Sequence, residues 1–97
     1  MRIISRRTLR EYGESNPEAK DALDSWYHEA KNAKWEKPTD VKEQYRSASI
    51  VGDNRVVFNI AGNKFRLVVR INYVAGIVYI RFVGTHADYD QIDAKEA

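Results

Sequence analysis

The stretch RFVGTHADYDQID, residues 81–93, brings together side chains that can exchange protons and bind phosphate. His86 follows a strand-like run and carries an imidazole, whose charge changes near neutral pH. Tyr89 stands one helical turn further on, so the two rings could overhang the same edge of the protein. Arg81 adds a guanidinium, whose fork matches the oxygens of a phosphate. This strand end is therefore a candidate functional site.

The same stretch also carries ordinary structural signals. Thr85 and Asp88 have the spacing of a capping box, which would give Asp88 a purely structural role. A lone histidine near a strand end is more often a hydrogen-bonding residue than a catalyst, and we interpret His28, inside a helical pattern, as structural. The acids around His86 fit no familiar metal-binding spacing, and we expect neither a metal nor another cofactor.

Three arginines are expected on one face of a sheet. In FRLVVRINY the apolar residues alternate with Arg66 and Arg70, which must then point away from the core. On the next strand we expect Ile80 and Phe82 to face the helices, which would place Arg81 beside the other two. Such arginines commonly keep an exposed face soluble, but without an acid between them they can also clamp a phosphate.

The charge distribution bears on this basic face. The chain has 97 residues, with 16 Lys and Arg against 14 Asp and Glu. Residues 54–87, however, contain several bases and no acid at all. A sheet that carries such a face would attract phosphates.

The first half of the chain predicts helices. Capping-box patterns begin at Thr8 and Ser15. The first predicts a brief helix that Gly13 ends, and the second a long amphipathic helix to about Lys34. A short opening strand and one further helical turn after Pro38 complete this half.

The second half has the period of two that strands require, with turns at 61–63 and 75–76. These short links predict a three-stranded antiparallel meander. The fold class is therefore α+β: an antiparallel sheet, N-terminal helices packed on one face and a short C-terminal helix, in one domain over residues 1–97. The absence of cysteine, of a signal peptide and of a long apolar run suits a cytoplasmic protein with no membrane segment.

Four blocks of the sequence together resemble the HigB-type toxins of bacterial type II toxin–antitoxin modules, within the RelE/ParE superfamily. They are RIISRRTLREY, WYHEAKNAKWEKPTDVK, SASIVGDNRVVFNIAGNKFRLVVRINY and IRFVGTHADYDQID. The resemblance implies a RelE-like fold and a cytoplasmic mRNA interferase that commonly cuts messages on the ribosome. It also implies a cognate helix-turn-helix antitoxin of the HigA type, with which the toxin could form a hetero-oligomer.

The implied reaction is a metal-independent attack of a ribose 2′-hydroxyl on the adjacent phosphate, which expels the 5′-oxygen. This chemistry needs a proton acceptor, a proton donor and positive charge near the phosphate. The catalytic candidates are His86, Arg66, Arg81 and Tyr89. The candidates for RNA binding are Lys64, Arg70, Arg55 and Asn63. Which group acts as acid and which as base stays open at this point.

Two other functions fit the same sequence. ParE-type relatives share the architecture but poison DNA gyrase by binding it, which would leave His86 without a catalytic role. A non-catalytic RNA-binding module would need aromatic residues exposed on its sheet. Most of the strand aromatics alternate onto the expected core face, which leaves Tyr79 and few others for stacking. These aromatics are Phe58, Phe65, Tyr73 and Phe82.

Overall fold

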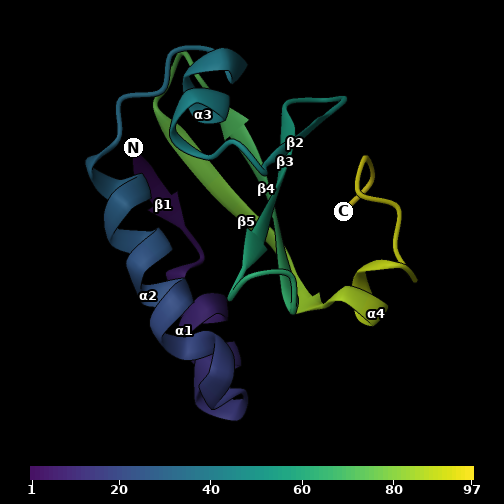
Figure 1. The fold of residues 1–97 in the computed structure, drawn as a ribbon. Coiled ribbons are helices and arrows are strands. Elements are labelled where there is room, and N and C mark those ends of the chain that lie inside the picture. Colours follow the sequence, from purple (N-terminus) through teal and green to yellow (C-terminus); the bar gives the residue numbers. More distant parts are fainter.

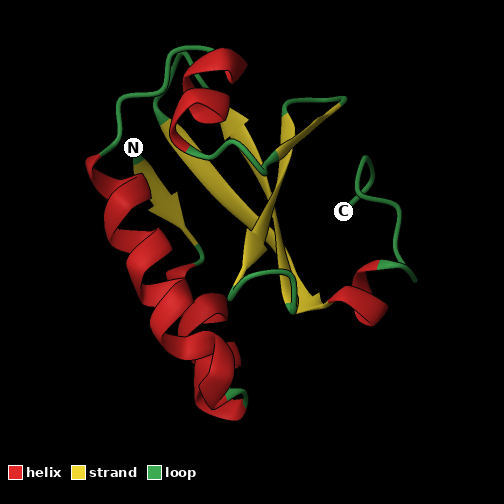
Figure 2. Ribbon diagram, viewed as in Figure 1, coloured by secondary structure: helices red, strands yellow, loops and turns green.

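The computed structural model describes all 97 residues as two groups of elements on either side of one sheet. Helices α1 and α2 lie on one side, and α4 with the C-terminal segment lies on the other (Figure 1; Figure 2). The elements are β1 (Arg2–Ile4), α1 (Arg6–Ser15), α2 (Pro17–Asn32), α3 (Pro38–Gln44), β2 (Ser49–Val51), β3 (Arg55–Ile60), β4 (Phe65–Asn72), β5 (Ile77–Thr85) and α4 (His86–Tyr89). None of the helices has both the length and the apolar character needed to cross a bilayer.

The sheet confirms the expected α+β class and adds a strand at each edge of the meander. Its strand order is β1-β5-β4-β3-β2. Strands β3, β4 and β5 pair antiparallel as the turns predict, and β2 extends this arrangement. Strand β1 pairs in parallel with β5, so the sheet is mixed. A parallel partner needs a long crossover connection, and helices α1 and α2 lie within it.

Two proline residues, rather than capping boxes, mark where α2 and α3 begin. Pro17 and Pro38 occupy the first turns of α2 and α3, where the missing N–H removes no helical hydrogen bond. The Ser15 cap is therefore wrong, because α1 continues through that residue. The Thr8 cap is also wrong: the N-cap of α1 is Ser5, three residues earlier, in a left-handed conformation (φ 72°).

Gly13 does not end α1; it allows α1 and α2 to pack closely. A Cβ atom at this buried position would lie 3.2 Å from the Cα of Lys20. The glycine is therefore a contact residue between two helices, and α1 ends at Ser15. At the far end, α2 stops at Asn32, close to the predicted Lys34.

The main core lies between the helices and the sheet, and Phe58 of β3 stands at its aromatic centre. The Phe58 ring centroid is 5.2 Å from that of Trp26 and 5.1 Å from that of Tyr45, both edge-on. Trp35 stacks on it at 6.1 Å. This cluster joins α2, α3 and the α2–α3 link to the sheet, so it holds the helical layer in place.

A β-bulge in β5 changes which residues face the helices. Val68 of β4 pairs with Phe82, whereas the next residue, Val69, pairs with Ile80, so Arg81 is the extra residue. Ile80 lies in the main core, but Phe82 packs on the opposite face. The prediction that Phe82 faces the helices is therefore wrong, because a bulge shifts the alternation by one residue.

The outer face of the sheet is only partly open. Val57 and Val68 are buried there, packed with Ala94 in a second, smaller cluster. The C-terminal segment, residues 90–97, therefore covers the middle of the face that we expected to be free. Figure 1 shows this segment, in yellow, on the side of the sheet away from α1 and α2.

Replacing Phe58 by alanine should lower the free energy of unfolding by about 3–5 kcal/mol, because a large buried ring is lost and a cavity remains. Urea denaturation measures the change. Val74→Ala is the matched control, since Val74 is fully exposed, and it should stay within about 0.5 kcal/mol of the parent. Equal stabilities for the two variants would contradict the packing described here.

Candidate active site

The short helix α4 is held at the end of β5 by the predicted capping box. The Thr85 hydroxyl accepts a hydrogen bond from the Asp88 backbone N–H at 3.1 Å, and the Asp88 carboxylate accepts one from the Thr85 N–H at 3.1 Å. The His86 N–H donates to the Lys64 carbonyl oxygen at 3.1 Å, which ties α4 to the β3–β4 turn. The capping box and its structural role for Asp88 are confirmed.

Gly84 allows α4 to lie close against the sheet. A Cβ atom at this position would lie 2.7 Å from Cζ of Phe82, closer than real Cβ contacts, and a tight 3.0 Å from Cβ of Asp88. Gly84 is also paired with Arg66 across the two strands. The glycine therefore brings the start of α4 next to Arg66.

His86 lies between the side chains of Arg66 and Asp90. Its Nε2 lies 2.9 Å from Nη2 of Arg66, and its Nδ1 lies 3.4 Å from Oδ2 of Asp90. A guanidinium has only donors, so Nε2 must accept. The ring nitrogen that carries the proton is then Nδ1, which faces the Asp90 carboxylate. The geometry therefore selects one neutral tautomer, with its lone pair on Nε2.

Arg66 is fixed on more than one side. Its guanidinium carbon lies 4.9 Å from the ring centroid of Tyr89, in a cation–π contact. Nη2 also reaches Oδ1 of Asn63 at 3.5 Å, the limit of a hydrogen bond. Nε is buried without a partner. Together with His86 and Asp90 these contacts define the Arg66–His86 site, made of Arg66, His86, Tyr89, Asp90 and Asn63.

The other predicted residues lie elsewhere. Nε of Arg55 and Nε of Arg81 both donate to the carbonyl oxygen of Ala97, at 2.9 and 3.1 Å. Arg70 is exposed. Lys64 points toward α2, where its Nζ lies 3.4 Å from Oε2 of Glu18 in an exposed ion pair. Such a pair is weak, about 0–1 kcal/mol, so Lys64 remains available to another anion.

The expected single patch is thus divided in two. Arg66 and Arg70 share the outer face as predicted, but Val68 lies between them, buried under the C-terminal segment. Four residues along a strand separate their Cα atoms by about 13 Å. Arg66, His86 and Tyr89 gather at one end of the face, whereas Arg55, Arg70 and Arg81 lie toward the other.

Asp90 is the site residue that sequence reasoning missed. It is one of the acids around His86, and no group of three or more His, Cys, Asp or Glu is placed to bind a metal. The available signal was its spacing: four residues after His86, on a helical turn, places a carboxylate beside the imidazole.

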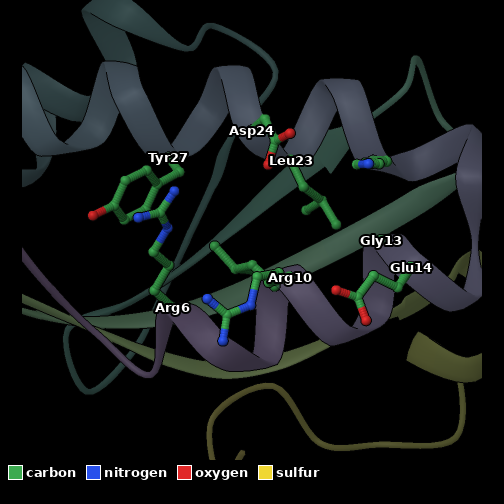
Figure 3. Close-up of a pocket in the computed structure, with 9 residues that line it drawn as sticks. Arg6, Arg10, Gly13, Glu14, Leu23, Asp24 and Tyr27 are labelled. Carbon is green, nitrogen blue, oxygen red and sulfur yellow. The ribbon is translucent and has the colours of Figure 1, made fainter.

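A separate groove lies between α1 and α2, away from the Arg66–His86 site. It encloses ≈ 250 Å³ and is lined by charged residues of both signs, among them Arg10, Glu14 and Asp24. In Figure 3 the Arg6 guanidinium lies over the Tyr27 ring, and its Cζ is 4.0 Å from the ring centroid. None of the residues predicted to act on RNA lines this groove.

An α+β fold with helices on one face of a five-stranded mixed sheet is consistent with the class of RelE-like toxins. The model of the HigB toxin family, the RelE-like toxic component of a toxin-antitoxin system, matches residues 19–92. The chain therefore belongs to the HigB toxin family.

Relatives of this family align with almost the whole chain. The mRNA interferase toxin HigB of Escherichia coli K12 is 29% identical over 92 residues, which is 93% of this chain and 88% of the relative. The proteins named mRNA interferase HigB from Escherichia coli O157:H7 and Shigella flexneri match with the same identity and coverage.

Gly84→Ala should disturb α4, because the added methyl group meets Phe82 and Asp88. We expect a loss of about 1–3 kcal/mol in unfolding free energy and a displaced His86 ring. Denaturation and the NMR signals of the His86 ring measure the two effects. Gly76→Ala is the control: its Cβ would meet nothing within 4 Å and it lies at the other end of β5, so the His86 signals should not move, although its φ of 71° also costs stability. Unchanged His86 signals in Gly84→Ala would contradict the close approach.

Proposed function

We propose that this toxin is a metal-independent endoribonuclease that cleaves messenger RNA at the Arg66–His86 site and so inhibits translation. The relatives named mRNA interferases support the substrate. The observation that carries the proposal is the 2.9 Å contact between Nη2 of Arg66 and Nε2 of His86. It joins a phosphate-binding group to a group that can accept a proton.

His86 is the general base in this proposal. Its Nε2 lone pair takes the proton of the ribose 2′-hydroxyl as that oxygen forms a bond to the adjacent phosphorus. The bond from phosphorus to the 5′-oxygen breaks, and the leaving oxygen takes up a proton. The products are a 2′,3′-cyclic phosphate and a 5′-hydroxyl. Bound RNA must displace the Arg66 N–H from Nε2, since one lone pair serves one donor.

Arg66 stabilises the negative charge that develops on the phosphate oxygens. Nη2 holds Asn63 and His86, which leaves Nη1 without a protein partner to bind the phosphate. The Tyr89 ring supports the guanidinium from one side. Its phenol, at the same edge as His86, can give the leaving 5′-oxygen its proton.

Asp90 positions the base. Its carboxylate lies 3.4 Å from Nδ1 of His86, and this contact keeps the proton on that nitrogen. It also stabilises the imidazolium that forms when Nε2 takes up the second proton. Removing such a carboxylate leaves the imidazole ring in place but makes it a weaker general base.

The partners follow from the same proposal. A toxin-antitoxin component has a cognate antitoxin, which we expect to be a helix-turn-helix protein of the HigA type. In this proposal the message is cut in the cytoplasm while it is being translated on the ribosome. Arg81, Lys64 and Arg55 contribute positive charge around the path of the RNA.

His86→Ala and Arg66→Ala should each relieve growth arrest in an induced culture while the protein stays folded. Loss of a proton-transfer group lowers the rate by about 10²–10⁴-fold, and loss of a charge-stabilising group by about 10²–10³-fold. The measurement is the mapping of new transcript 5′ ends after brief induction, with translation running or blocked.

The matched controls are His28→Ala and Arg10→Ala, which remove the same side chains from α2 and α1. Both should stay toxic and produce the parental cleavage pattern. Full toxicity of the His86 and Arg66 variants, at equal expression, would argue against this site. A DNA-damage response without new transcript ends would instead indicate a gyrase poison.

A further inference from the structure

The far end of the outer face holds a pocket that the cleavage chemistry does not use. It encloses ≈ 190 Å³ and is lined by Asn54, Arg70, Ile71, Asn72 and Tyr79. These residues come from the β2–β3 turn, the end of β4 and the start of β5. The pocket lining contains no acid.

Arg70 has hydrogen-bonding capacity to spare. The three ion pairs of the structure involve other residues, and no hydrogen bond engages its guanidinium. Its neighbour Arg55, in contrast, donates to the carbonyl oxygens of Asp53 and Ala97. Five N–H donors of Arg70 are therefore free to meet a ligand with several oxygens.

The strand register places like charges side by side. Arg70 pairs directly with Arg55 across β3 and β4, and like charges at such positions repel each other. No aspartate or glutamate forms an ion pair with either arginine. Asp53 accepts from Arg55 only through its backbone carbonyl oxygen, and Asp93 and Glu96 line a neighbouring hollow beside Arg81. An anion bound between the two guanidiniums would remove the repulsion, which favours an anionic ligand.

An aromatic ring completes the pocket. Tyr79 pairs with Arg70 on its other side, across β4 and β5, so Arg70 stands between Arg55 and Tyr79 in the strand register. Tyr79 is half-buried and Arg70 is exposed. A basic group next to an accessible ring is a combination that binds a single-stranded nucleic acid, by the phosphate and by stacking of a base.

We propose that this pocket, centred on Arg70 and Tyr79, is a second RNA subsite that holds one phosphate and one base of the message away from the cleaved bond. The inference rests on the proposed nuclease function. Arg66 and Arg70 are about 13 Å apart along β4. At a stacked rise of about 3.4 Å per nucleotide, this distance spans about four nucleotides. The RNA passes beside the C-terminal segment to reach the pocket.

The test is the affinity of Arg70→Ala for oligoribonucleotides of increasing length. All are 2′-O-methylated, so they bind without being cut. Lengths of about two nucleotides reach only one site, whereas about eight nucleotides reach both. The variant should bind the long oligonucleotide about tenfold more weakly. The slope of log affinity against log salt should fall by about the value of one phosphate contact. The short oligonucleotide should bind as it does to the parent.

Arg10→Ala is the matched control, because it removes the same charge from α1 and should show no dependence on length. Tyr79→Leu should weaken binding of the long oligonucleotide without changing its salt dependence. Thermal unfolding confirms that each variant is folded. Equal losses at both lengths, or no loss at either, would overturn the subsite.

The result also separates the subsite from the nuclease proposal. If toxin with an intact site binds the long oligonucleotide through Arg70 but no transcript is cut, the nuclease proposal fails and the subsite stands. If transcripts are cut through His86 but Arg70→Ala binds every length like the parent, the subsite fails alone.

Discussion

The hydrogen bond between Arg66 and His86 is the interaction on which the candidate site depends. It needs a strand residue and a helix residue twenty positions apart to meet at 2.9 Å. Three local features bring this about: the capping box that starts α4, the bond from the His86 N–H to the Lys64 carbonyl, and the absence of a side chain at Gly84. Each fixes the backbone around His86, so the side-chain contact is preorganised by the fold.

The C-terminal segment divides the outer face of the sheet into two parts. By burying Val57 and Val68 together with Ala94, it replaces one continuous basic face by two basic ends. One end combines positive charge with an imidazole and a carboxylate, which suits proton transfer. The other combines positive charge with a free guanidinium and a phenol ring, which suits binding alone. A single RNA strand that contacts both ends would be held at two points and cut at one.

The sequence predicts what depends on neighbours in the chain. The strands of the meander, the Thr85 capping box and the shared face of Arg66 and Arg70 all follow from short-range periodicity and are observed. It does not predict the bulge at Arg81, which turns Phe82 outward, or the fold-back of residues 90–97, because both depend on contacts between distant segments. For the same reason, the expectation that three arginines would gather around His86 holds for Arg66 alone.

The most direct test of the account is the protonation pattern of the His86 ring, observed by nitrogen NMR of the imidazole at about pH 8, where ordinary histidine side chains are neutral. The account predicts a proton on Nδ1 and a free lone pair on Nε2, because Arg66 can only donate and Asp90 can only accept. A ring that carries its proton on Nε2 would show that the guanidinium and the imidazole do not meet, and would contradict both the site and the role given to it.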